Sequence, residues 1–248
     1  MPTAIELRSL SKTFAPRLLT LENLDLQIAA GEFVSVMGPS GCGKSTLLRL
    51  IAGLETPSRG SIKIADAFQS FGFVFQEAHL LPWRNLEENI ALPLQFQGAT
   101  PEEIQSRITA MLELIGLTDF RHAYPSQLSG GMKMRASLAR ALITRPKILL
   151  LDEPFAALEE SLRYRLDIEL RSLWKQLDLT VVFVTHSVSE AVFVSNRLIT
   201  LSQRPGHIVS DEPIDLPQDR SAEMKWTQSF LHRVARIAHQ LESAEAKS

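Results

Sequence analysis

The segment "GPSGCGKST" (residues 38–46) is a glycine-rich loop that directly follows an apolar run. Gly38, Gly43, Lys44 and Ser45 fit G-x-x-x-x-G-K-[ST], the pattern of loops that bind nucleoside phosphates. Glycines let the loop wrap so that backbone N–H groups converge on phosphate oxygens, and the helix behind it adds its free N–H groups. The alternative, a chance glycine turn, does not explain the strand–loop–helix context. The residues predicted to bind nucleotide here are Gly38, Pro39, Ser40, Gly41, Cys42, Gly43, Lys44, Ser45 and Thr46.

Cys42 is the one cysteine of the chain and lies inside this loop, near Lys44 and a predicted helix N-terminus. Both features lower the pKa of a thiol, so we expect this thiol to be more acidic than usual. The alternative is a small residue at a tolerant loop position. A single cysteine excludes an intrachain disulfide and fits a reducing compartment.

The composition of the 248-residue chain is that of a soluble globular protein, with 45% hydrophobic and 22% charged residues. The net charge of -2 gives no reason to expect nucleic acid as a partner. Glu6 and Arg8 interrupt the apolar stretch that a signal peptide would need. No segment approaches the ~20 apolar residues of a membrane-spanning helix. We therefore expect a chain that is soluble by itself.

Short apolar runs that end abruptly at polar or glycine residues are typical of strands buried in a parallel sheet. Such runs are "FVSVMG" (33–38), "FGFVFQ" (71–76), "KILLLDEP" (147–154) and "TVVFVTH" (180–186). Helical patterns between them, as at 44–54 and 129–143, indicate an α/β fold. Residues 5–14 and 19–28 alternate apolar and polar side chains, as half-exposed antiparallel strands do. The predicted fold is a P-loop NTPase core with a mainly parallel sheet, an N-terminal antiparallel β portion and an inserted α-helical subdomain.

We expect residues 1–248 to form a single domain. Its nucleotide-binding core comprises 1–76 and 147–209, and a helical subdomain is inserted at 77–146, where we find no convincing strand. A C-terminal extension covers 210–248. Five apolar residues of this extension recur at helical spacing, so we expect them to form one face that packs on the core. They are Trp226, Phe230, Val234, Ile237 and Leu241.

The run "ILLLDEP" (148–154) supplies the second half of the predicted site. Asp152, at the end of a buried strand, would bind Mg²⁺ through water opposite the Ser45 hydroxyl. Glu153 follows where a carboxylate would orient or deprotonate an attacking water. Paired acidic residues at a strand end are also found simply solvated, and the nearby phosphate loop is what favours a metal site.

The segment "LSGGMKMR" (128–135), with the phosphate loop and "LLLDEP", resembles the ATP-binding-cassette (ABC) ATPases. The resemblance covers almost the whole chain, from "LSKTF" to "RPGHI". It implies that Ser129, Gly130 and Gly131 form a signature loop, which opens a helix and binds the γ-phosphate held by a second subunit. A serine hydroxyl, two slim residues and a helix N-terminus are together suited to an anion.

The same resemblance implies roles for three residues elsewhere in the chain. Gln76 would sense Mg²⁺ and water while facing a membrane partner, His186 would contact the γ-phosphate, and Phe14 would stack on adenine. Taken singly, they have plainer alternatives: a polar strand end, a structural histidine and a core residue. The catalytic residues expected in this way are Lys44, Gln76, Glu153 and His186, and the metal ligands are Ser45, Gln76 and Asp152.

Three features depart from the family pattern. Met132 stands where glutamine is usual, and we expect little effect on the anion site. Glu159 replaces the usual aspartate of the dimer-contact loop and shifts its charge by one methylene group. The segment before Gln76 is shorter than usual and need not touch the nucleotide.

Two segments, "FQEAHLLPWRNLEENI" (75–90) and "LSQRPGHIV" (201–209), resemble importer ATPases for nitrate, alkylsulfonates, taurine, bicarbonate or thiamine-precursor pyrimidines. In that group the segment with Leu81, Pro82 and Trp83 lines a groove that receives a short cytoplasmic helix of the permease. An exposed aromatic residue beside proline would suit such docking. The alternative is a Trp83 side chain buried in the helical subdomain.

The resemblance implies an ATPase subunit at the cytoplasmic face of the inner (plasma) membrane, bound there peripherally. Two copies, or this chain and a paralogue, would enclose two ATP molecules with Mg²⁺ and drive transmembrane permease subunits. An extracytoplasmic solute-binding protein would deliver a small anion, and no nucleic acid is expected.

Two alternatives remain. A soluble cassette ATPase acting on DNA or ribosomes is disfavoured by the single cassette, the single cysteine and the near-neutral charge. A slowly hydrolysing regulatory subunit has only Met132 and Glu159 in its favour.

Overall fold

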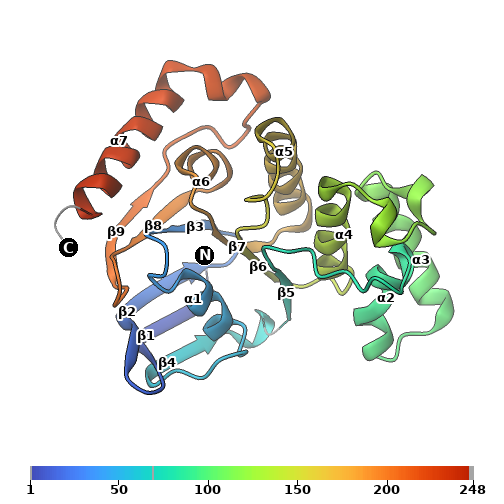
Figure 1. Ribbon diagram of the computed structural model, residues 1–248, viewed down its shortest axis with the longest axis horizontal. Helices are drawn as coiled ribbons and strands as arrows, with labels where there is room; N and C mark the ends of the chain where they lie inside the picture. Colours follow the sequence, from blue (N-terminus) through green and yellow to red (C-terminus); the bar gives the residue numbers. More distant parts are fainter. Residues whose placement is uncertain (1, 69, 246–248) are drawn as a thin grey trace.

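The fold is organised around a six-stranded sheet in the order β5-β6-β7-β3-β8-β9, shown in the centre of Figure 1. The computed structural model describes residues 2–68 and 70–245. Neighbouring strands pair in parallel from β5 to β8, and the edge strand β9 pairs antiparallel with β8. The mainly parallel sheet predicted from the apolar runs is confirmed.

The elements of the described residues are as follows. The strands are β1 (Thr3–Phe14), β2 (Leu18–Ala29), β3 (Phe33–Met37), β4 (Arg59–Ile64), β5 (Phe71–Val74), β6 (Ile148–Asp152), β7 (Thr180–Val184), β8 (Arg197–Leu201) and β9 (Ile208–Pro213). The α-helices are α1 (Lys44–Ile51), α2 (Leu86–Phe96), α3 (Pro101–Leu114), α4 (Gly130–Leu142), α5 (Glu160–Leu177), α6 (Val188–Val194) and α7 (Gln228–Glu245). None of these helices combines the length and the apolar character needed to cross a membrane.

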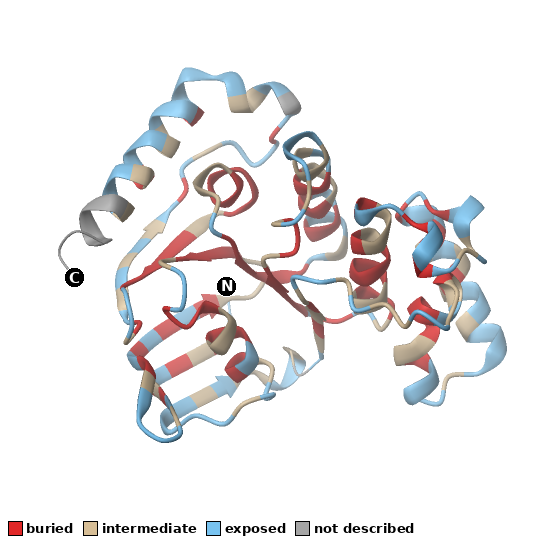
Figure 2. Ribbon diagram, viewed as in Figure 1, coloured by how far each residue is buried: buried red, intermediate tan, exposed pale blue. Residues whose placement is uncertain are grey.

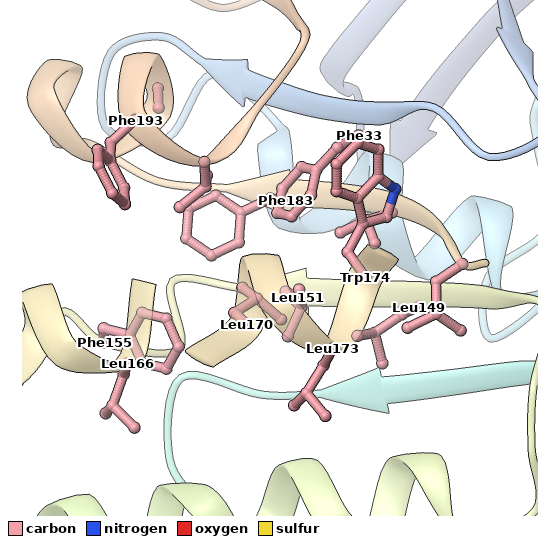
Figure 3. Close-up of a cluster of buried hydrophobic side chains, with 14 of the residues drawn as sticks. Phe33, Leu149, Leu151, Phe155, Leu166, Leu170, Leu173, Trp174, Phe183 and Phe193 are labelled. Carbon is pink, nitrogen blue, oxygen red and sulfur yellow. The ribbon is translucent and has the colours of Figure 1, made fainter. Parts of the chain in front are cut away.

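Both faces of the central sheet are covered, so β3, β6 and β7 are buried along their whole length (Figure 2). Alternate side chains face opposite layers, as the strand period of two requires. Phe33, Leu149 and Phe183 belong to the cluster under α5 and α6, which Figure 3 shows. Their neighbours Val34 and Leu150 belong to the cluster under α1.

The second cluster is closed by a smaller antiparallel sheet in the order β2-β1-β4. The alternating pattern of the N-terminal region therefore predicted β1 and β2 correctly. β4, which the sequence analysis did not identify as a strand, pairs with β1 on the other side. Helix α1 lies between the two sheets and buries Leu47 and Leu48.

Helices α2, α3 and α4 form a subdomain at one side of the sheet, on the right in Figure 1, and carry their own apolar cluster. Helix α4 belongs to both parts: Leu138 and Leu142 pack in the central cluster, and Ala136 and Ala139 pack in the subdomain. Residues 77–146 contain no strand among the described residues, as predicted.

The C-terminal extension packs on the core through α7, where Phe230 and Ile237 are each 1% exposed. The prediction that Trp226 belongs to the same face is wrong, because Trp226 is 81% exposed. It lies in a 3-10 turn (Ala222–Trp226) that precedes α7, so the helical spacing does not extend back to it. Strand β9 runs across residue 209, where we expected the nucleotide-binding core to end, and residues 246–248 lie outside the described residues.

The aromatic centre of the main cluster provides a test of the packing. The Phe183 ring is fully buried, 6.1 Å from Phe33 and 6.2 Å from Phe155 between ring centroids. We expect Phe183→Ala to lower the free energy of unfolding by about 3–5 kcal/mol, because it removes buried contacts and leaves a cavity. The matched control Trp226→Ala should change it by less than about 0.5 kcal/mol. Urea unfolding measures both, and equal effects would contradict this packing.

Candidate nucleotide-binding site

A cavity of about 580 Å³ opens over the glycine-rich loop, at the edge where the parallel strands end. It brings together residues that lie far apart in the sequence, because the carboxyl ends of parallel strands meet at one edge. The lining residues are Phe14, Leu18, Thr20, Gly38, Ser40, Gly41, Gly43, Lys44, Ser45, Thr46, Glu153, His186 and Arg204. Most of the predicted loop residues are therefore in place, together with Phe14, Glu153 and His186.

The loop reaches helix α1 through Gly43, whose φ of 109° is one that side chains rarely allow. A Cβ atom at Gly43 would lie 2.5 Å from the Cδ2 atom of Leu21, so a larger residue would also require the Leu21 side chain to move. No side chain caps the N-terminus of α1. The backbone N–H groups of its first turn are consequently available to an anion in the cavity.

Lys44 is buried, and its ammonium group is hydrogen-bonded to the backbone of the glycine-rich loop. The Nζ atom donates to the carbonyl oxygens of Gly38, at 2.8 Å, and of Pro39, at 3.0 Å. The positive charge therefore lies at the floor of the cavity, where the phosphates of a nucleotide would compete with neutral carbonyl acceptors for it.

Ser45 and Asp152 join the loop to the end of β6. The Ser45 hydroxyl donates to Oδ1 of Asp152 at 2.9 Å. Burial raises the pKa of Asp152, and the hydrogen bond from Ser45 opposes that shift. Hydroxyl and carboxylate oxygens suit Mg²⁺, which commonly completes its shell with waters and substrate phosphates. No cluster of three His, Cys, Asp or Glu residues suited to a metal occurs within the described ranges. A Mg²⁺ ion here would therefore depend on phosphate oxygens as well.

Glu153 follows the end of β6 by one residue and His186 follows the end of β7 by two, and their side chains meet at the cavity. His186 Nδ1 lies 3.1 Å from Oε2 of Glu153. The backbone of Glu153 has a φ of 45° and donates its N–H to the Val184 carbonyl at 3.0 Å. A carboxylate can accept a proton from water, which leaves the carboxyl group neutral, and the hydrogen bond to the imidazole can keep that carboxylate in position.

Phe14, the last residue of β1, also lines the cavity. The ammonium group of Lys12 lies 4.6 Å from the centre of the Phe14 ring. Lys12 is itself fixed by hydrogen bonds to the Glu55 carboxylate, at 2.7 Å, and the Thr56 carbonyl, at 2.9 Å. The ring is thus supported by a fixed cation, and its alternative interpretation as a core residue is wrong because it lines the cavity.

Seven predicted residues are absent from the lining of this cavity: Pro39, Cys42, Gln76, Ser129, Gly130, Gly131 and Asp152. Asp152 is joined to the lining by its hydrogen bond with Ser45. Gln76 is exposed two residues after β5. Ser129 caps α4 and accepts the N–H of Met132 at 3.3 Å. Because this bond uses the backbone of residue 132, it does not depend on the glutamine that Met132 replaces.

The expectation of an acidic thiol at Cys42 is wrong. Cys42 is fully buried, and burial raises the pKa of its thiol more than the charge of Lys44 lowers it. Cys42 and Pro39 shape the loop from behind and do not line the cavity. Three lining residues were not predicted from the sequence: Leu18, Thr20 and Arg204. Arg204 lies in the quoted "LSQRPGHIV" segment, but no local pattern indicated where that segment would pack.

Glu159, a departure from the family pattern, and the aromatic residue Trp83 lie outside the cavity lining. Glu159 is the N-cap residue of α5, and its side chain makes no capping hydrogen bond. Trp83 is 71% exposed, so the alternative of a buried Trp83 is wrong. The loop that contains Trp83 is held by hydrogen bonds from the buried Asn89 side chain. The Nδ2 group of Asn89 donates to the carbonyls of Arg84 and Asn85, both at 2.9 Å.

Comparison with known proteins places this site in a family. The family model described as "ABC transporter" matches residues 21–156. An aliphatic sulfonates import ATP-binding protein, SsuB, of Bacillus cereus is 39% identical over 88% of this chain and 90% of its own length. A nitrate import ATP-binding protein, NrtD, of Synechocystis is 40% identical over 87% and 84%.

A solved structure agrees with these relatives. It is described as a dimeric, post-hydrolysis state of the ATP-binding cassette MJ0796 bound to ADP and Pi. The match covers 86% of this chain and 100% of the chain of that structure, with a TM-score of 0.75 and 34% sequence identity. With the glycine loop, the acidic strand end and the histidine at one cavity, the chain belongs to the ABC transporter family, as one of its ATP-binding and ATP-hydrolysing chains.

Proposed function

We propose that this chain is the ATPase subunit of an importer for a small anion. The observation that carries the proposal is the cavity in which Lys44, the Ser45–Asp152 pair and the Glu153–His186 pair meet. The names of the relatives, which import aliphatic sulfonates and nitrate, support an oxyanion such as nitrate, a sulfonate, taurine or bicarbonate.

In the proposed reaction each group has a distinct task. Lys44 exchanges its bonds to Gly38 and Pro39 for the β- and γ-phosphates, and the N–H groups of the first turn of α1 bind the same oxygens. Ser45 and Asp152, with Gln76, would hold Mg²⁺, which supplies charge neutralisation for the phosphates when it is bound.

Glu153 accepts the proton of the attacking water in this scheme, and His186 holds the carboxylate in position and contacts the γ-phosphate. The 3.1 Å contact between the two side chains supports that division of labour. Phe14 would stack on the adenine ring, with Lys12 as its support.

A second copy of the chain, or a paralogue, completes the site in this proposal. Ser129, Gly130 and Gly131 are not among the lining residues of the chain's own cavity, so they remain available to a nucleotide held by another chain. The dimeric cassette with ADP and Pi among the matching structures supports such an arrangement. The phosphates would then link the two chains, because they satisfy anion sites on both.

The permease would bind at the exposed segment around Trp83. An aromatic side chain that is exposed on a braced loop is a typical anchor for a partner protein. This contact would hold the chain peripherally at the cytoplasmic face of the membrane, and an extracytoplasmic solute-binding protein would act on the other side of the permease. The regulatory alternative loses support, since Glu153 and His186 are both in place.

Replacing the proposed base tests the reaction. We expect Glu153→Gln to bind ATP, to accumulate as an ATP-dependent dimer and to release phosphate about 10²–10⁴-fold more slowly, because a neutral amide cannot accept the proton. Phosphate release and light scattering on a sizing column measure the two effects. Lys44→Ala, the control, should lose both turnover and the dimer, since it loses the phosphate ligand. Unimpaired turnover in Glu153→Gln would refute the role of Glu153.

Capture of the partner tests the importer. Affinity purification of the tagged chain from detergent-solubilised native membranes should recover a multi-span permease, identified by mass. We expect Trp83→Ala to reduce that recovery by about tenfold or more, as loss of an interface anchor does. Trp226→Ala, a second exposed tryptophan, should recover as much permease as the unaltered chain. Recovery of ribosomes or DNA in place of a permease would contradict transport.

A further inference from the structure

The loop of residues 202–207, between β8 and β9, contributes Arg204 to the lining of the nucleotide cavity. In Figure 1 this loop lies beside β2. The Gly206 N–H donates to the Thr20 carbonyl at 2.9 Å, and the Glu22 N–H donates to the Gly206 carbonyl at 3.0 Å. These bonds join the loop to the strand that also contributes Thr20 to the cavity.

The same loop packs against the back of the phosphate loop. A Cβ atom at Gly206 would lie 2.2 Å from the Cys42 carbonyl oxygen, so only glycine fits there. The Leu21 side chain of β2 lies against both loops. Its Cδ2 atom would be 3.2 Å from a Cβ atom placed at Gly206 and 2.5 Å from one placed at Gly43. The two loops and β2 therefore form one packed unit.

Hydrogen bonds within the loop fix its backbone. The buried Ser202 hydroxyl accepts the His207 N–H at 3.0 Å. The same oxygen lies 2.8 Å from the Gln203 carbonyl and 3.1 Å from the Pro205 carbonyl. The residue between these two carbonyls, Arg204, consequently leaves the loop at a fixed point.

Arg204 is the residue of this loop that reaches the cavity. Over residues 2–68 and 70–245, its guanidinium group has no hydrogen bond and no ion pair. The other basic residues of the lining are engaged: Lys44 with two carbonyls, and His186 with Glu153. An unpaired guanidinium group thus faces a cavity whose ligand carries several negative charges.

We propose that Arg204 binds the phosphate chain of the nucleotide and raises the affinity of the site for ATP. The inference rests on the assignment of this cavity to ATP. A guanidinium group only donates hydrogen bonds and matches the geometry of phosphate oxygens. The packing of its loop on the phosphate loop favours the phosphates over the base as its target. Arg204 would thereby add a second cation to that of Lys44.

The test is the affinity of Arg204→Gln for ATP and AMP, measured by equilibrium dialysis. We expect the dissociation constant for ATP to rise about tenfold, as loss of a charge-assisted bond at an exposed site does, and that for AMP to rise less. Added salt should narrow the difference between variant and unaltered chain, because it screens an exposed charge. Arg59→Gln, an exposed arginine of β4 outside the cavity, should bind both nucleotides normally.

Steady-state hydrolysis gives a second readout. Arg204→Gln should raise KM for ATP with little change in kcat, because the bond is made equally before and during the reaction. An unchanged affinity for ATP, or equal losses for ATP and AMP, would overturn the proposal. If the unaltered chain itself fails to bind ATP, the assignment of the cavity fails, which is a separate outcome.

Discussion

The parallel pairing of the central strands is the constraint on which the rest of this structure depends. Because β3, β6, β7 and β8 run in one direction, their carboxyl ends meet at one edge. The phosphate loop, Glu153, His186 and the loop of Arg204 each follow one of these strands by a few residues. A change of register in one strand would move its functional group away from the others. The buried apolar side chains on both faces of the sheet are what prevent such a change.

The C-terminal extension also helps to fix the elements around the site, through Arg220. Helix α6, which begins after His186, ends at carbonyl groups that the buried Arg220 binds. The Nη1 group of Arg220 donates to the carbonyl oxygens of Val192 at 2.8 Å, Phe193 at 2.7 Å and Ser195 at 2.8 Å. Burial removes water from the guanidinium group and lowers the pKa of Arg220 to about 9. The three carbonyl oxygens take the place of that water as hydrogen-bond acceptors. The extension thus fixes the helix that follows His186.

Much of this arrangement could be predicted from the sequence, because the relevant signals are local. The apolar runs gave the buried strands, and the fixed spacing of Gly38, Gly43, Lys44 and Ser45 gave the loop. The features that were missed depend on distant contacts. The pKa of Cys42 is set by burial beneath another loop, and Trp226 leaves the helical face because the chain turns before α7 begins. Strand β9 has the composition of a turn and is a strand because β8 provides an edge to pair with.

The position of Arg204 in the cavity has the same origin. It follows from Gly206 packing on the Cys42 carbonyl, and the two residues are separated by most of the chain. No spacing pattern within a single segment encodes such a contact. The residues that complete the site from outside, Ser129 to Gly131, could be named only through the family resemblance.

In the proposed dimer, each ATP is enclosed by the phosphate loop of one chain and the Ser129 loop of another. The most direct test is crosslinking between two versions of the chain, both with Cys42→Ser. One version carries Ser40→Cys in the phosphate loop, and the other carries Ser129→Cys. Treatment of the mixture with a short bismaleimide should join the two versions when ATP is present, and leave them separate without it. Failure to join them in the presence of ATP, under conditions in which both bind it, would contradict the shared site.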